Sequence, residues 1–169
     1  MHPAGGLCIL GAMQITLSLS EQKLILEGRE GNFLYLVSTA AQGAGEQQGS
    51  QCTPRGRHLV RARFGAGLPA GAVFLGRRFT GEYFSPALAE AHPGRDWVLS
   101  RILWLGGMEP GHNQGGDVDS FQRFIYIHGT PDTEPMGEPA SHGCIRMRNA
   151  DVIDLFDRVP VATPVVIVE

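Results

Sequence analysis

The chain has 169 residues and a formal net charge of −3, with 43% hydrophobic and 18% charged residues. This composition excludes a disordered chain, and the length favours one domain with its own core. Lys23 is the only lysine and no basic cluster stands out, which argues against a nucleic-acid partner because phosphate binding needs clustered positive charge. No stretch approaches the roughly 20 apolar residues that span a bilayer.

A single domain is expected at residues 13–169, preceded by an N-terminal extension at residues 1–12. Residues 7–10 are apolar, but no Lys or Arg precedes them. A secretory signal peptide instead combines a basic start with an apolar stretch of roughly 7–15 residues. The sequence therefore predicts a cytoplasmic location, with a periplasmic location as the alternative.

Apolar residues alternate with polar ones from Met13 to Leu19, which predicts a half-buried strand. The stretches 24–27 and 33–37 flank a Gly-containing connection and predict a hairpin. Residues 40–51 are rich in Gly, Gln and Ala and predict an exposed loop. Further strands are expected, in chain order, at 58–64, 72–75, 100–105, 121–127 and 165–168.

Two helices are expected. Residues 85–91 predict a short one that Pro93 stops, and a Gly-rich loop follows at 106–120. Asn149 is expected to cap the second helix, because its side chain can accept a backbone N–H of the first turn. An i, i+3, i+4, i+7 spacing predicts one buried face of that helix, formed by Val152, Leu155, Phe156 and Val159. Together, these elements predict a mainly β fold.

The densest cluster of reactive side chains is the heptapeptide SHGCIRM at residues 141–147, and His128 ends the apolar run upstream of it. A thiolate is the reactive form of cysteine, and a nearby imidazole and positive charge favour that form at neutral pH. This grouping predicts covalent catalysis by a cysteine nucleophile.

Cys144 is the candidate nucleophile. His142 is the nearest base in the sequence, and it meets Cys144 only if the segment is extended or a turn, because residues i and i+2 share a face on a strand but not on a helix. Backbone N–H groups of Gly143 and Cys144 are candidates for an oxyanion hole. Arg146 is expected to lower the thiol pKa or to hold a substrate carboxylate, and His128 to orient the substrate or to share in proton transfer.

Other interpretations of these residues stay open. The alternative interpretation of Cys144 is an inert buried thiol. A zinc site formed by His128, His142 and Cys144 is another alternative. Their spacing matches no common metal motif, so neither a metal nor a cofactor is expected. Three cysteines are an odd, low count that fits free thiols, and a Cys8–Cys52 bridge is the weaker alternative.

The motif and its surroundings resemble the L,D-transpeptidase catalytic domain (YkuD type). The resemblance rests on Ile127-His128-Gly129-Thr130 and on residues 140–147. Asn149-x-Asp151 belongs to the same match, and further pieces occur in the order of the family at 15–26, 37–39, 53–56 and 163–167, of which the N-terminal ones are weak alone. Together they cover residues 13–169, and the His-Gly-Cys motif with its Ser and Arg flanks is the specific part.

The resemblance implies a β-sandwich-like fold with one or two short helices and an acyl-enzyme on Cys144. His142 would be the base, and the backbone carbonyl of Gly143 would orient it. Three further residues would complete the substrate-binding site: His128, Ser141 and Arg146. The substrate would be a peptidoglycan stem tetrapeptide or muropeptide, cleaved between the L-centre of its diamino acid and D-alanine. Carbapenem-type β-lactams would be covalent inhibitors.

Water as the acyl acceptor would make the chain an L,D-carboxypeptidase that recycles tetrapeptides, whereas an amine would give a cross-link or a protein attachment. Because no leader is evident, hydrolysis is slightly preferred over transpeptidation. A non-catalytic stem-peptide binding module is the alternative from a different class, and the intact cysteine motif argues against it. A sortase also pairs Cys with Arg and His, but in a different context from Ser-His-Gly-Cys.

Overall fold

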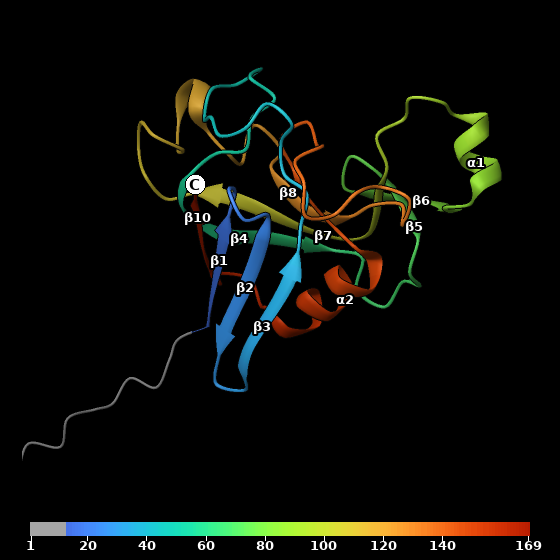
Figure 1. The fold of residues 1–169 in the computed structure, drawn as a ribbon, viewed down its shortest axis with the longest axis horizontal. Helices are drawn as coiled ribbons and strands as arrows, with labels where there is room; N and C mark the ends of the chain where they lie inside the picture. The colour runs from blue at the N-terminus through green and yellow to red at the C-terminus, as the bar shows by residue number, and fades with distance from the viewer. Residues whose placement is uncertain (1–12) are drawn as a thin grey trace, which may run out of the picture.

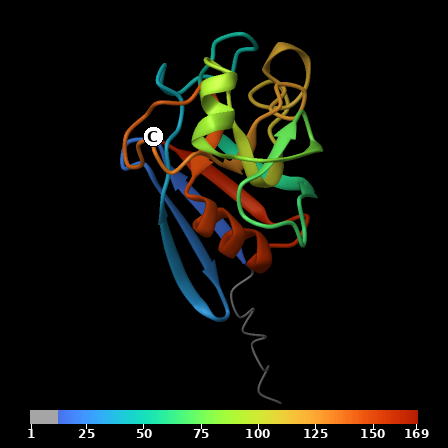
Figure 2. The same ribbon diagram turned by 90° about the vertical axis from the view of Figure 1, so that its right-hand side faces the viewer.

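A computed structural model describes residues 13–169 as a mainly β protein (Figures 1 and 2). The strands are β1 (Gln14–Ser18), β2 (Lys23–Gly28), β3 (Gly31–Leu36), β4 (Gly56–Phe64), β5 (Ala72–Leu75), β6 (Arg78–Tyr83), β7 (Val98–Gly107), β8 (Tyr126–Gly129), β9 (Ile145–Met147) and β10 (Pro164–Val168). The helices are α1 (Pro86–Ala91) and α2 (Asn149–Arg158), with a 3₁₀ turn η1 (Gly116–Val118). The prediction of a mainly β fold with one or two short helices is confirmed.

The expected extension at 1–12 and the Cys8–Cys52 alternative lie outside the described residues. Within residues 13–169, neither helix is long and apolar enough to cross a bilayer.

Hydrogen bonds join the strands into one curled sheet in the order β3-β2-β1-β10-β4-β7-β5-β6. β8 pairs with β7 and in turn carries β9. The pairs β1–β10 and β8–β9 are parallel, whereas the others are antiparallel. Figure 1 shows the β2–β3 hairpin at one end of the sheet and α1 beyond β5 and β6 at the other.

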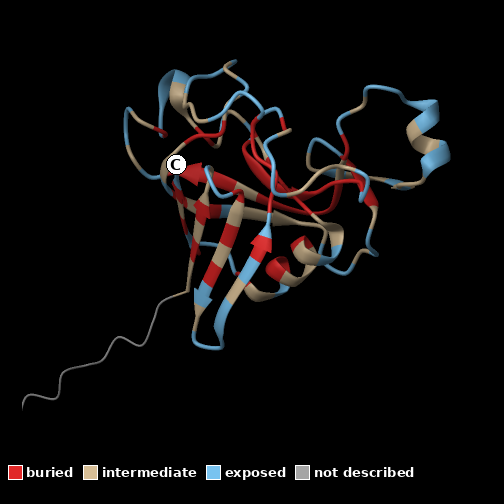
Figure 3. Ribbon diagram, in the orientation of Figure 1, coloured by how far each residue is buried: buried red, intermediate tan, exposed pale blue. Residues whose placement is uncertain are grey.

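The core follows from the alternation in the strands and from one face of α2 (Figure 3). Ile15 and Leu17 of β1 are fully buried, and their polar neighbours are not. The predicted helical face is buried in the same core and comprises Val152, Leu155, Phe156 and Val159. Burial of this face against the sheet fixes where β8 and β9 lie, because α2 follows directly after β9 in the chain.

The expected helix cap differs from the structure. Arg148 holds the N-cap position, but its side chain makes no capping hydrogen bond, and Asn149 is the first helical residue. The amide of Asn149 is used elsewhere: Oδ1 accepts from the Ser100 hydroxyl at 2.6 Å, and Nδ2 donates to the Thr130 carbonyl at 3.0 Å. This side chain therefore ties β7 and the end of β8 to the start of α2.

The strand expected at 121–127 begins only at Tyr126. Phe124 has a φ of +57°, in the left-handed region that no extended strand adopts, so the chain turns before it enters β8. The short strand β9 was not predicted, because three residues are too few to show an alternating pattern.

His58 of β4 is buried at 1% exposure and held in one tautomer. Its Nδ1 lies 2.9 Å from the Gly56 carbonyl, which only accepts, so Nδ1 carries the hydrogen. Nε2 then accepts from the Ser120 hydroxyl at 2.8 Å. Burial lowers the pKa of His58 from 6.5 to about 4, so the folded protein holds a neutral imidazole.

This burial predicts an acid-dependent loss of stability. Between pH 6.5 and about 4 the unfolded chain binds a proton at His58 that the folded chain does not. The free energy of unfolding should therefore fall on acidification across this window, with a contribution of at most about 1.4 kcal/mol per pH unit. Urea unfolding at several pH values would show a steeper slope in the wild type than in His58→Gln. Equal slopes in the two proteins would contradict the assignment.

Candidate active site

The parallel pairing of β8 with β9 brings the upstream histidine and the cysteine motif to one face of the sheet. His128 lies opposite Arg146, and Ile127 lies opposite Ile145. Both isoleucines are fully buried in the main core, and side chains alternate along strands, so His128 and Arg146 project from the other face. Cys144 precedes Ile145 by one residue and packs in the hydrophobic cluster on that same face.

The Cys144 thiol lies between two backbone groups. Its Sγ accepts from the N–H of Tyr126 at 3.4 Å and donates to the carbonyl of Phe124 at 3.2 Å. Burial raises the pKa of the thiol to about 11, and the opposing effects of the Tyr126 N–H, Arg146 and Arg123 only partly offset this. Cys144 is therefore a protonated thiol at neutral pH, and a base would be needed to form its thiolate.

His128 is buried, and a backbone carbonyl selects its tautomer. Nδ1 lies 2.6 Å from the carbonyl oxygen of Gly129, so Nδ1 carries the hydrogen and Nε2 carries the lone pair. Burial lowers the pKa of His128, which keeps the imidazole neutral near pH 7. His128 and Cys144 are diagonal neighbours, and the strand spacing with a two-residue offset separates their backbones by about 8 Å. The hydrogen bonds of both side chains go to backbone groups, and the described residues show none between His128 and Cys144.

His142 lies at the rim of the site. Its side chain is 63% exposed, and Nδ1 is 3.8 Å from a carboxylate oxygen of Asp96. The Gly143 carbonyl, which was expected to orient His142, accepts from the Thr53 hydroxyl at 2.9 Å instead. Among the described residues no hydrogen bond joins His142 to this carbonyl, and the predicted site histidine that contacts a backbone carbonyl is His128.

The loop that carries the cysteine is held from within. The Ser141 hydroxyl donates to the carbonyl of Cys144 at 2.6 Å and accepts from the N–H of Gly143 at 3.2 Å. Gly143 has a φ of +131°, and a Cβ there would lie 3.3 Å from the carbonyl of Cys52, so glycine is required. Ser141 is 2% exposed, and its hydroxyl shapes this loop rather than facing the cavity as a substrate contact.

Arg146 is nearly buried among acceptors. Nη2 lies 3.0 Å from a carboxylate oxygen of Asp96, and Nη1 lies 3.7 Å from Glu134 and 3.3 Å from the Ala140 carbonyl. Two carboxylates therefore offset its charge, and a substrate carboxylate would compete with them.

Two charged residues of the site were not found from the sequence. Asp96 connects His142 with Arg146, and Arg123 lines the cavity beside Cys144. Both lie in irregular segments outside any motif, so neither spacing nor periodicity indicated them.

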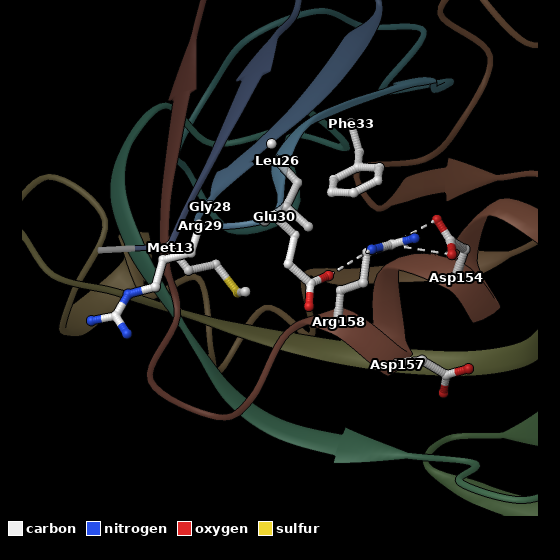
Figure 4. Close-up of a pocket in the computed structure, with 10 residues that line it drawn as sticks. Met13, Leu26, Gly28, Arg29, Glu30, Phe33, Asp154, Asp157 and Arg158 are labelled. Atoms are coloured by element: carbon white, nitrogen blue, oxygen red, sulfur yellow. Dashed lines mark hydrogen bonds and ion pairs between the residues drawn. The ribbon is translucent and has the colours of Figure 1, made fainter. Parts of the chain in front are cut away.

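A cavity of about 220 Å³ opens beside Cys144. His142, Arg123 and Phe124 line it together with three glutamine side chains, those of Gln48, Gln51 and Gln122. A larger cavity of about 660 Å³ lies between the β2–β3 hairpin and α2 (Figure 4). It shares no lining residue with the first, so it is separate from the candidate active site.

Comparison with known proteins assigns the family. A family model of the L,D-transpeptidase catalytic domain (YkuD) matches residues 12–167. The chain therefore belongs to the YkuD family of L,D-transpeptidase catalytic domains. YqjB of Bacillus subtilis (strain 168), which carries the name of an L,D-transpeptidase, is 47% identical over 56 residues. That alignment spans 32% of this chain and 32% of YqjB.

Solved structures share the fold. L,D-transpeptidase 3 from Mycobacterium tuberculosis, in complex with a faropenem-derived adduct, aligns with a TM-score of 0.57 at 16% identity and covers 94% of this chain. The L,D-transpeptidase LdtMt1 in complex with imipenem aligns with a TM-score of 0.53 at 15% identity and covers 92% of this chain. This chain spans 60% and 58% of those two chains. The β-sandwich-like L,D-transpeptidase fold expected from the sequence is confirmed.

The Thr53 hydroxyl offers a test of how the cysteine loop is held. It donates to the Gly143 carbonyl and accepts from the N–H of Ala40 at 3.0 Å, fully buried. Thr53→Val keeps the shape but leaves both groups without a partner, which should cost about 1–3 kcal/mol for each and slow the alkylation of Cys144. Urea unfolding and iodoacetamide labelling would measure these effects. Thr53→Ser retains the hydroxyl and is the control; a valine variant as stable and reactive as the serine variant would contradict this role.

Proposed function

We propose that this chain forms an acyl-enzyme on Cys144 with the tetrapeptide stem of peptidoglycan and releases the terminal D-alanine. One observation carries the proposal: His128, neutral and fixed by the Gly129 carbonyl, shares a sheet face with a protonated thiol. Family membership supports the same chemistry, as do the imipenem complex and the faropenem-derived adduct of the two solved relatives. We accordingly expect β-lactams of the carbapenem type to acylate Cys144.

In the acylation step, Sγ of Cys144 attacks the carbonyl carbon at the L-centre of the diamino acid. The thiol proton passes to Nε2 of His128 and then to the amine of the departing D-alanine, so a thioester forms as the amide bond breaks. Negative charge develops on the carbonyl oxygen, and preorganised N–H donors stabilise such an oxyanion. The N–H of Cys144 makes no hydrogen bond to any residue in the range 13–169 and is available for this purpose.

The other predicted residues receive roles that follow from their contacts. His142 is the alternative base, but its exposure and its contact with Asp96 favour a position at the cavity rim, where it meets substrate. Arg146 faces the same side as Cys144 and orients the substrate together with Asp96. Ser141 acts through the loop that presents the cysteine.

The second half of the reaction has two candidates. The cavity of about 220 Å³ is smaller than the roughly 300–1,000 Å³ of typical ligand pockets, so it suits one peptide end and favours water as the acceptor. The relative YqjB is named as an L,D-transpeptidase, and a transpeptidase transfers the acyl group to an amine. This similarity therefore favours an amine acceptor. We propose hydrolysis first and transpeptidation as the alternative, and the cytoplasmic location stays a prediction.

A single assay tests the proposal and separates the two acceptors. Purified protein is incubated with a disaccharide tetrapeptide, with and without an added amine acceptor, and the products are analysed by mass spectrometry. The wild type should release one D-alanine in water, and Cys144→Ala should release none because no thioester can form. Cys8→Ala, which removes another thiol of the chain, is the matched control and should retain activity.

Cross-linked dimers or amine adducts would show that transpeptidation dominates. A tetrapeptide that binds but stays intact in both conditions would contradict the enzymatic proposal and favour the stem-peptide binding module. Equal activity of the wild type and Cys144→Ala would contradict the assignment of the nucleophile.

A further inference from the structure

Arg123 is a cavity residue whose guanidinium is engaged by a segment distant in the sequence. Nη1 donates to the carbonyls of Gly45 at 3.3 Å and Glu46 at 3.0 Å. Nη2 donates to the carbonyl of Cys52 at 2.8 Å and to the hydroxyl of Ser50 at 3.4 Å. One planar side chain therefore binds both ends of a single loop.

The loop at residues 45–52 forms part of the wall of the Cys144 cavity through Gln48, Gly49 and Gln51. Its sequence, GEQQGSQC, contains no large apolar side chain that could anchor it in the core. Gly49 and Gln51 both have positive φ, +80° and +59°. Ordering such a backbone costs conformational entropy, and the four hydrogen bonds from Arg123 help to offset this cost.

The same guanidinium brings positive charge to the reacting sulfur. The charge of Arg123 lowers the pKa of Cys144, although burial outweighs it. Burial also lowers the pKa of Arg123 itself, because its charge is partly removed from water. A partly buried charge is screened less than an exposed one and acts more strongly on its neighbours.

We propose that Arg123 is a positioning residue of this enzyme: it fixes the 45–52 loop as a wall of the acyl-donor cavity and stabilises negative charge on the Cys144 sulfur as it reacts. The inference rests on the proposed function. Its two parts are separable, because lysine keeps the charge but lacks the planar fork of donors, whereas methionine lacks both.

The test compares Arg123→Lys and Arg123→Met with Arg78→Met, which removes an exposed arginine on β6. Three quantities are measured: hydrogen exchange of the 45–52 peptide, the pH midpoint of iodoacetamide labelling at Cys144, and KM and kcat for the tetrapeptide. Both Arg123 variants should exchange faster in the loop and raise KM roughly tenfold, the loss expected for one charge-assisted hydrogen bond. Only Arg123→Met should also move the labelling midpoint to higher pH.

The proposal would be overturned if Arg123→Met kept the loop exchange, the KM and the labelling midpoint of the wild type. It would also be overturned if Arg78→Met changed these three quantities as much as Arg123→Met does. If Arg123→Met does not fold, Arg123→Lys decides the loop part through exchange and KM, and unchanged values overturn it. If every protein leaves the tetrapeptide intact, the proposed function fails, and loop exchange and the labelling midpoint still report on Arg123 independently of turnover.

Discussion

The parallel ladder between β8 and β9 is the interaction on which the site depends. It joins only three residue pairs, yet it aligns His128 with Arg146 and sets Cys144 one step before the ladder. A shift of one residue would turn every side chain of a strand to the opposite face. The complete burial of Ile127 and Ile145 specifies the register, because a shift would remove both from the core. Hydrophobic burial on one face thus determines which side chains lie together on the other.

The resting site is close to electrically neutral at its centre. Burial favours an uncharged thiol and an uncharged imidazole, so the geometry fits proton transfer coupled to attack and not a preformed ion pair. Charges lie around this centre: Asp96 offsets Arg146 at 3.0 Å, and Arg123 is partly offset by loop carbonyls. In the proposed reaction, such an arrangement would stabilise the charge that develops at little cost in the resting state.

Short motifs and local periodicity predicted the parts of this protein that depend on neighbouring residues in the chain. The helical face of α2 and the alternation in β1 belong to this class, and the motif at 141–147 indicated the family in the same way. Sequence proximity favoured His142 as the base, whereas we propose His128, which the register of β8 and β9 places on the same sheet face as Cys144. Asn149 carries a good capping side chain, but Ser100 and Thr130 use its amide instead. The contributions of Asp96 and Arg123 depend entirely on tertiary contacts.

In the proposed mechanism, His128 accepts the thiol proton and so activates Cys144. The most direct test of this step is the rate at which imipenem acylates Cys144, followed by intact-protein and peptide mass spectrometry in the wild type, His128→Gln and His142→Gln. Loss of a general base slows a step by about 10²–10⁴-fold, so His128→Gln should acylate that much more slowly, while His142→Gln stays within a few-fold of the wild type. The reverse order, or an adduct on a cysteine other than Cys144, would contradict the account.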